Sequence, residues 1–206
     1  MNDTACMPSR REALRDVLTA TLALAGASLV PADARAQLSR EIHLMTHPVR
    51  TGNLRDFDFL VGSWNVANRR LRRRWVGSDE WDEFPATSRC TQHLRGVVNV
   101  EELVMPTLDS SGLTLRTFDL AQRRWAIYWI SSRAGVLFPP VYGGFDGERG
   151  EFYGDDTDDG RAVKVRFVWT HFARTTGATN VARWEQAYSR DGRTWETNWV
   201  MDFRRA

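Results

Sequence analysis

The sequence predicts an all-β fold, a single up-and-down antiparallel β-barrel of about ten strands, preceded by a cleavable signal and a short helix or linker. From Asp56 onward, alternating apolar and polar residues recur about every 10–14 positions, separated by Gly, Asn and Asp. No stretch after residue 50 has a helical period. Short links make sequential strands antiparallel neighbours, and closing the sheet removes its two unpaired edges. A two-sheet sandwich is the alternative.

Length and composition set the outer limits of this prediction. The chain has 206 residues, which leaves room for one domain and an extension. Hydrophobic residues make up 42% and charged residues 26%, so disordered, collagen-like and coiled-coil classes are excluded. The net charge of +2 gives no field that would imply a nucleic-acid partner.

Residues 1–36 are predicted to be a twin-arginine-type signal peptide. The segment Ser9–Arg15 (SRREALR) resembles the twin-arginine pattern, and an apolar run, Val17–Val30, follows it. That run is shorter than the ~20 residues of a membrane-spanning helix. Ala34-Arg35-Ala36 supplies the small residues of a cleavage site, so we expect a periplasmic or secreted protein without a stable membrane anchor.

Residues 37–53 are predicted to form a short helix or linker and residues 54–206 the barrel. Each predicted strand carries the alternating pattern and is followed by a turn signal such as Asp109–Gly112, Asp146–Gly150, Asp158–Gly160 or Arg190–Arg193. The expected strands are 62–73, 79–93, 97–105, 112–118, 124–132, 141–146, 150–155, 162–171, 181–189 and 194–203.

Large apolar residues share one parity of these strands, which predicts that this parity faces the barrel interior. The set is Trp64, Val66, Trp125, Ile127, Trp129, Val165, Phe167, Trp169, Trp184, Trp195, Trp199 and Met201. The opposite parity carries charges such as Lys164, Arg166, Arg183, Glu185 and Asp202, which suits a solvated exterior. A slip of one residue in register would exchange the two faces.

Several separate blocks resemble a bacterial family of uncharacterised, DUF1579-like proteins over roughly residues 54–205. They are Asp56–Trp64 (DFDFLVGSW), Gly77–Trp81, Asn99–Glu101, Ile127–Trp129, Phe152–Asp156, Arg183–Ala187 and Trp195–Phe203. The resemblance implies a calycin-type barrel, related in architecture to lipocalins, fatty-acid-binding proteins and nitrobindin-like haem barrels. Gly62-x-Trp64 matches the Gly-x-Trp of lipocalin first strands, where the Trp packs across the barrel bottom. The resemblance implies a fold and not an activity.

Polar residues on predicted inward positions are the candidates for anchoring a ligand among these aromatic rings. An interior Arg89–Glu102 arrangement is expected to be a structural pair or a ligand anchor, because a buried charge is costly unless paired. Ser131 also falls on a predicted inward position. Arg133 begins a loop, 133–140, that is a candidate lip over the open end. The candidate ligand-binding residues are Trp64, Arg89, Glu102, Trp125, Trp129, Phe167, Trp169, Trp184, Gln186, Tyr188 and Trp199.

No resident cofactor and no metal site are predicted. His43 and His47 are four residues apart but lack the carboxylate and further ligands of a zinc site. His171 and His93 are weak candidates for an axial haem ligand, so haem is kept as an alternative. Cys90 is expected to be an inert buried thiol. The Arg69–Arg74 run precedes Asp79–Glu83, and pairing between these adjacent strands is favoured over nucleic-acid binding.

Three functions remain open at this stage. The first is an exported barrel that binds a small, mostly apolar or aromatic molecule, suggested by nine Trp and ten Phe, all after residue 56. The second is a barrel enzyme, either a haem-dependent or a cofactor-free isomerase or lyase. The third is a structural barrel whose interior is filled by side chains. The expected partner is a small hydrophobic or aromatic ligand, and the protein is expected to be a monomer or homodimer.

Overall fold

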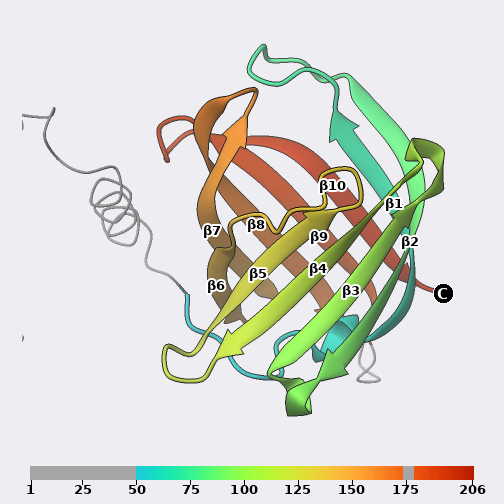
Figure 1. Ribbon diagram of the computed structural model, residues 1–206, viewed down its shortest axis with the longest axis vertical. Helices are drawn as coiled ribbons and strands as arrows, with labels where there is room; N and C mark the ends of the chain where they lie inside the picture. The colour runs from blue at the N-terminus through green and yellow to red at the C-terminus, as the bar shows by residue number, and fades with distance from the viewer. Residues whose placement is uncertain (1–49, 174–178) are drawn as a thin grey trace, which may run out of the picture. The chain divides into compact units, whose positions relative to one another are not determined.

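The fold is a closed barrel of ten antiparallel strands in up-and-down order (Figure 1). The computed structural model describes residues 50–173 and 179–206. The strands are β1 Gly62–Leu71, β2 Trp81–His93, β3 Val98–Met105, β4 Ser110–Asp119, β5 Arg124–Ser131, β6 Val141–Asp146, β7 Arg149–Asp158, β8 Arg161–Ala173, β9 Thr179–Ser189 and β10 Glu196–Arg205. Each strand pairs with its neighbour in sequence, and β10 pairs with β1.

The predicted fold class is therefore confirmed, and the sandwich alternative is wrong. Both edges that a ten-stranded sheet would expose are used, because β1 and β10 hydrogen-bond to each other from Trp64↔Arg205 to Arg70↔Trp199. Three short 3-10 helices, η2 Asp58–Leu60, η3 Leu94–Gly96 and η4 Pro106–Leu108, are the helical elements among the described residues. The signal peptide, most of the predicted linker, His43 and His47 lie outside these residues.

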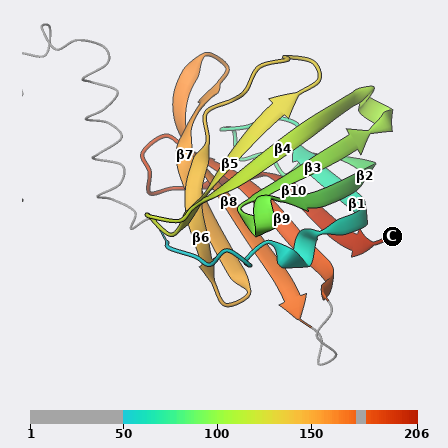
Figure 2. The same cartoon turned by 60° about the horizontal axis from the view of Figure 1, so that its bottom comes forward.

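One end of the barrel is closed by the segment that precedes β1, which runs across this end (Figure 2). Phe57 and Leu60 of this segment are fully buried. The Phe57 ring meets Trp125, Phe145 and Trp169 edge-on at centroid distances of 5.0, 5.1 and 6.1 Å. Edge-to-face contacts are a preferred geometry for aromatic pairs, so this cluster forms a solid aromatic plug.

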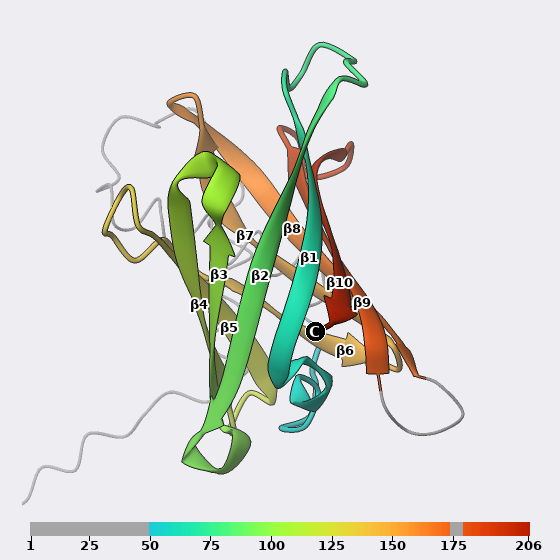
Figure 3. The same cartoon turned by 90° about the vertical axis from the view of Figure 1, so that its right-hand side faces the viewer.

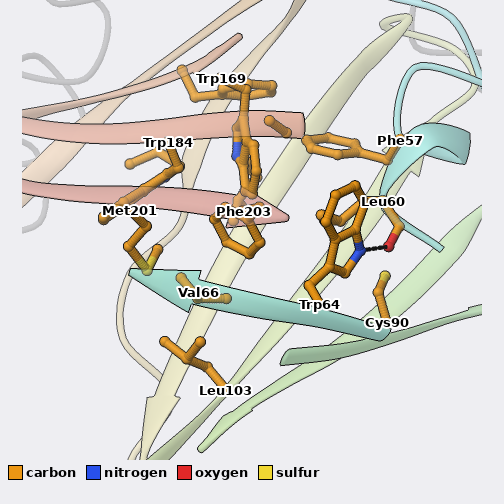
Figure 4. Packing of buried hydrophobic residues seen from close by; sticks show 14 of the residues in the cluster. Phe57, Leu60, Trp64, Val66, Cys90, Leu103, Trp169, Trp184, Met201 and Phe203 are labelled. Atoms are coloured by element: carbon orange, nitrogen blue, oxygen red, sulfur yellow. Dashed lines mark hydrogen bonds between the residues drawn. The ribbon is translucent and has the colours of Figure 1, made fainter. Parts of the chain in front are cut away.

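Trp64 and Arg205 fasten that plug to the two strands that close the barrel. The Trp64 indole donates to the Leu60 carbonyl at 2.7 Å, as Figure 4 shows. The Arg205 guanidinium lies 3.9 Å from the centroid of the Trp64 ring. It donates to the carbonyls of Val61 and Phe59 at 2.6 and 2.5 Å. A planar cation with a fork of donors stacks on an indole and binds two carbonyls at once, which a lysine does not do.

The other end of the barrel carries the connections β1–β2, β3–β4, β5–β6, β7–β8 and β9–β10. Figure 3 shows the long β1–β2 hairpin projecting at the end opposite η2. Arg72 and Arg73 in this hairpin pair with Asp82 and Glu80 at 2.6 and 3.6 Å. The predicted pairing of the basic run with the acidic strand that follows is thus confirmed.

A bulge in β10 corrects the predicted position of Trp195. Thr197 pairs with Ala187 but Trp199 pairs with Gln186, so Asn198 is an extra residue. Such a bulge shifts the alternation by one. Trp199 therefore faces inward, whereas Trp195 packs outside, 5.9 Å from Tyr153 and 4.9 Å from the Arg166 guanidinium.

We expect Gly62→Ala to destabilise the barrel more than Gly77→Ala. Both glycines have positive φ, +118° and +66°, but a Cβ at Gly62 would lie 2.6 Å from Arg205 Nη1, while a Cβ at Gly77 meets no atom within 4 Å. Backbone strain costs about 1–3 kcal/mol, and only Gly62→Ala also displaces the Arg205 contact. Urea denaturation measures the free energy of unfolding of both variants. Equal losses of stability would show that displacing Arg205 adds nothing to the cost of Gly62→Ala.

Candidate functional site

The described part of the barrel encloses a cavity of about 310 Å³ above the aromatic plug. Strands β3 to β10 and the β5–β6 loop line it, so it occupies the interior rather than the outer surface. The lining residues are Glu101, Leu103, Thr114, Arg116, Ile127, Tyr128, Trp129, Ser131, Phe138, Pro139, Val141, Asp155, Asp156, Thr157, Val165, Phe167, Trp169, Trp184, Gln186, Tyr188, Trp199 and Met201.

Aromatic side chains from β5, β8, β9 and β10 form a large part of the cavity wall. Trp184 meets Phe167 and Trp199 edge-on, with ring centroids 4.9 and 5.8 Å apart. Figure 4 shows Trp184 close to Met201, with Trp169 beyond it. Gly112 on β4 makes room for Trp129, because a Cβ there would lie 1.9 Å from the Trp129 ring. The wall therefore offers flat apolar surfaces of the kind that bind rings and hydrocarbon chains.

The floor of the cavity is a buried ion pair between Arg116 of β4 and Glu101 of β3. Both side chains are almost fully buried, and Arg116 Nη2 donates to Glu101 Oε2. Ser88 donates to the other carboxylate oxygen at 2.5 Å, and Arg116 Nη1 donates to Asn99 Oδ1 at 3.2 Å. The two charges neutralise each other, as burial in a barrel interior requires.

This polar floor rests directly on the aromatic plug. The Arg116 guanidinium carbon lies 4.9 Å from the centroid of Phe57 and 5.4 Å from that of Trp169. Cation–π contacts of this kind partly compensate a cation for lost hydration. The charged floor of the cavity is thus in direct contact with aromatic rings.

Polar groups mark the open end of the cavity. The Tyr188 hydroxyl donates to Asp156 at 2.9 Å, and Lys164 pairs with Asp155 at 2.5 Å. Burial, together with the neighbouring Asp156 charge, raises the pKa of Tyr188 far above its usual value, so it remains a neutral donor.

The β1–β2 hairpin is tied to this end through Trp75. The Trp75 indole and Arg74 both donate to Asp158 of β7, at 2.6 and 2.5 Å, and the Trp75 ring stacks on Tyr188 with centroids 6.5 Å apart. Burial opposes ionisation of Asp158, but the Arg74 and Trp75 hydrogen bonds outweigh it and lower its pKa.

Most of the predicted ligand-binding residues line the cavity. These are Trp129, Phe167, Trp169, Trp184, Gln186, Tyr188 and Trp199. Trp64 and Trp125 face inward as predicted, but they belong to the plug and do not line the cavity.

The predicted inward placement of Arg89 and Glu102 is wrong. Both side chains are exposed, and the two residues are direct cross-strand partners on the outside of β2 and β3. The residues on either side of them, Ser88, Cys90, Glu101 and Leu103, point inward instead. A register error of one residue exchanged the two faces on these strands.

Sequence reasoning missed Arg116 and Glu101, which carry the interior charge. In β4 the parity of Arg116 also holds Gly112, Thr114 and Phe118, while Leu113 and Leu115 take the outer face and are half-buried there. Because of these two leucines, the hydrophobic pattern of β4 predicts that its outer face points into the core. The signal that identifies the inner face is Phe118, which lies on the same parity as Arg116.

The two histidines among the described residues, His93 and His171, do not line the cavity. His93 is exposed and shares a 2.9 Å hydrogen bond with Thr91. His171 stacks on Phe59 at 4.4 Å beside the plug, and burial lowers its pKa. Neither residue is therefore placed to coordinate the iron of a haem bound in the cavity.

Comparison with known proteins adds no relative: no family model matches the chain, and neither does any curated protein. The class that the geometry defines is a ten-stranded closed barrel with an internal, largely aromatic cavity. In the described part of the chain, no helix has the length and apolar character needed to cross a bilayer.

We expect Glu101→Gln to lower the free energy of unfolding by about 3–5 kcal/mol, because it leaves Arg116 as an uncompensated buried cation. The double variant Glu101→Leu, Arg116→Met removes both charges and is expected to recover most of that loss. As the exposed control, Asp82→Asn breaks the Arg72–Asp82 pair and should cost less than about 1 kcal/mol. Chemical denaturation compares the three variants. If the double variant is less stable than Glu101→Gln, the uncompensated charge of Arg116 is not the cause of the loss in Glu101→Gln.

Cys90 is expected to resist thiol reagents in the folded protein. The side chain is 1% exposed, and burial raises its pKa to about 12, so the reactive thiolate is scarce at pH 8. In a Cys6→Ser variant, where Cys90 is the single cysteine, Ellman's reagent should label the protein only after urea unfolding. Rapid labelling of the native protein would show that this region opens readily.

Proposed function

We propose that this protein binds a small, mostly apolar or aromatic molecule inside its barrel. The observation that carries the proposal is the cavity of about 310 Å³ with its wall of Trp, Phe and Met side chains. Ligand pockets commonly measure about 300–1,000 Å³ and are lined mainly by apolar and aromatic groups with a few polar ones. The cavity has both features, since polar side chains, among them Arg116, Glu101, Gln186 and Tyr188, stand between the aromatic and aliphatic groups of the lining.

The two other candidate functions have less support in the described residues. A structural barrel with a filled interior needs no cavity of this size. The haem-dependent enzyme relies on His93 or His171, and both lie away from the cavity. Export to the periplasm and kinship with DUF1579-like proteins stay predictions from the sequence. The position of Trp64 supports a calycin-type barrel. Trp64 packs at the closed end of the barrel, where the resemblance implies, and contacts Leu60 and Arg205 there.

Binding is tested by titrating tryptophan fluorescence with a panel of hydrophobic compounds and by native mass spectrometry of the purified full chain. Trp129, Trp184 and Trp199 border the cavity, so a ligand in van der Waals contact should quench or shift their emission. Absence of any spectral response, with no co-purifying molecule, would refute the proposal.

A cavity-filling variant makes this test specific for the interior. Thr114→Phe places a ring into the cavity from β4, and it should weaken the binding of any responding compound at least about tenfold. The matched control is Thr117→Phe, which adds the same ring on the outer parity of the same strand. Equal weakening by both variants would place the binding site elsewhere.

A further inference from the structure

Trp129 of β5 lies against a part of the wall that has no side chain. Its neighbour on β4 is Gly112, and a Cβ at Gly112 would fall 1.9 and 2.0 Å from Cη2 and Cζ2 of Trp129. In the register of these strands Gly112 pairs with Ser131, two residues from Trp129. Trp129 and Gly112 are therefore diagonal neighbours on the inner face, a spacing that a large ring can span. The six-membered ring of the indole lies directly on the Gly112 backbone.

The backbone conformation does not by itself require glycine at position 112. The φ of Gly112 lies outside the left-handed region, unlike that of Gly62 or Gly77. Glycine in the interior of a strand loses more conformational entropy on folding than other residues and packs no side chain, and it often marks a close approach by a neighbour. At Gly112 the space that a side chain would fill is the space that the Trp129 ring occupies.

The other large rings of the wall are fixed by their neighbours, whereas Trp129 is not. Trp184 contacts the rings of Phe167 and Trp199. Trp199 also donates a hydrogen bond to Asn68 at 3.0 Å. In the described part of the chain, the Trp129 indole forms no aromatic pair, and its N–H has no hydrogen-bond acceptor. The wall behind the Trp129 ring is therefore what sets its position.

A side chain at position 112 would move the Trp129 ring into the cavity. Gly112 shares the inner parity of β4 with Thr114 and Arg116, so its Cβ would point to the barrel interior. The atoms that this Cβ would meet belong to the far end of a side chain, which can rotate, whereas the ladder between β4 and β5 holds the backbone in place. The ring would therefore leave the wall and take up space that the cavity now offers.

The Trp129 ring stands beside the loop that borders the open end of the cavity. The Trp129 carbonyl accepts a hydrogen bond from the Phe138 amide at 2.9 Å, and Ile130 forms a β-bridge with Leu137. Phe138 and Pro139 of this loop line the cavity together with Trp129. A displaced ring would thus narrow the cavity on the side of this loop.

We propose that Gly112 and Trp129 set the width of the cavity and thereby select the ligand by size. With glycine at position 112 the indole lies at the wall, and the cavity keeps its volume of about 310 Å³. With a larger residue at this position the indole projects into the cavity, and only a smaller molecule fits. This assignment rests on the proposed binding function and specifies how the same cavity discriminates between ligands.

Two uncharged compounds that differ by one ring measure this width. 1-Naphthylamine and N-phenyl-1-naphthylamine share a naphthalene ring system, and the second carries an additional phenyl ring. Equilibrium dialysis of the full chain gives both dissociation constants, and their ratio is the size preference. Gly112→Ala should weaken the binding of N-phenyl-1-naphthylamine at least about tenfold and that of 1-naphthylamine less than about threefold.

The double variant Gly112→Ala, Trp129→Ala tests whether the indole is the cause of that loss. Without the ring the added methyl group displaces nothing, so the double variant should have the same size preference as Trp129→Ala alone. If Gly112→Ala lowers the preference equally with and without the indole, the assignment to Trp129 is overturned.

Trp129→Ala alone tests the width even if Gly112→Ala does not fold. Removing the ring widens the cavity, so this variant should prefer the larger compound more strongly than the wild type does. An unchanged or reduced preference would show that the Trp129 ring does not limit the cavity, which overturns the proposal.

The matched control is Gly135→Ala, the same substitution in the loop between β5 and β6, where a Cβ meets no atom within 4 Å. It should leave the size preference unchanged. Circular dichroism shows which variants are folded. A loss of preference in Gly135→Ala as large as that in Gly112→Ala would contradict a specific effect at Gly112.

The outcomes separate this inference from the proposed function. If the wild-type chain binds both compounds and folded Gly112→Ala keeps the wild-type preference, the width assignment fails while the binding barrel stands. If the wild-type chain binds neither compound, the proposed function fails, and this inference fails with it.

Discussion

The contact between the first and last strands is the constraint on which the rest of this structure depends. Arg205 of β10 stacks on Trp64 of β1 and binds the carbonyls of Phe59 and Val61, so one side chain holds the closing strand pair and the chain segment before it. That segment carries Phe57 into the centre of the plug. A barrel that is closed laterally and sealed at one end has a defined interior, and a cavity can persist there.

The same plug explains how a charged pair is stable so deep in the protein. Arg116 is placed over Phe57 and Trp169, and Glu101 receives hydrogen bonds from Arg116 and Ser88. Burying two ions is expensive, and each of these contacts replaces part of the water that they lose. The arrangement gives the cavity a polar end and a largely aromatic wall, and in the function we propose this polarity would orient the ligand.

The outer face of β3 and β4 shows why the inner face was hard to identify from sequence. Val100 and Leu115 pair across these strands on the outside, where they are half-buried, while Glu101 and Arg116 point inward. A prediction from hydrophobicity alone therefore exchanges the inner and outer faces of these two strands. Strands β5, β8 and β9 follow the usual rule, and there the predicted wall residues Trp129, Phe167 and Trp184 line the cavity. The parity signal is reliable where large aromatic rings define it and fails where small and polar residues face inward.

The sequence by itself determined the number of strands and their antiparallel succession, because turn residues and period-two alternation are local properties of the chain. It favoured a closed barrel, but the pairing of β1 with β10 decided between the barrel and a two-sheet sandwich. Only the tertiary structure decided which charges lie inside. The bulge at Asn198 and the register Arg89↔Glu102 depend on how neighbouring strands align, and a shift of one residue turns a side chain from the cavity to the exterior. The site is therefore a product of register, which no single strand encodes.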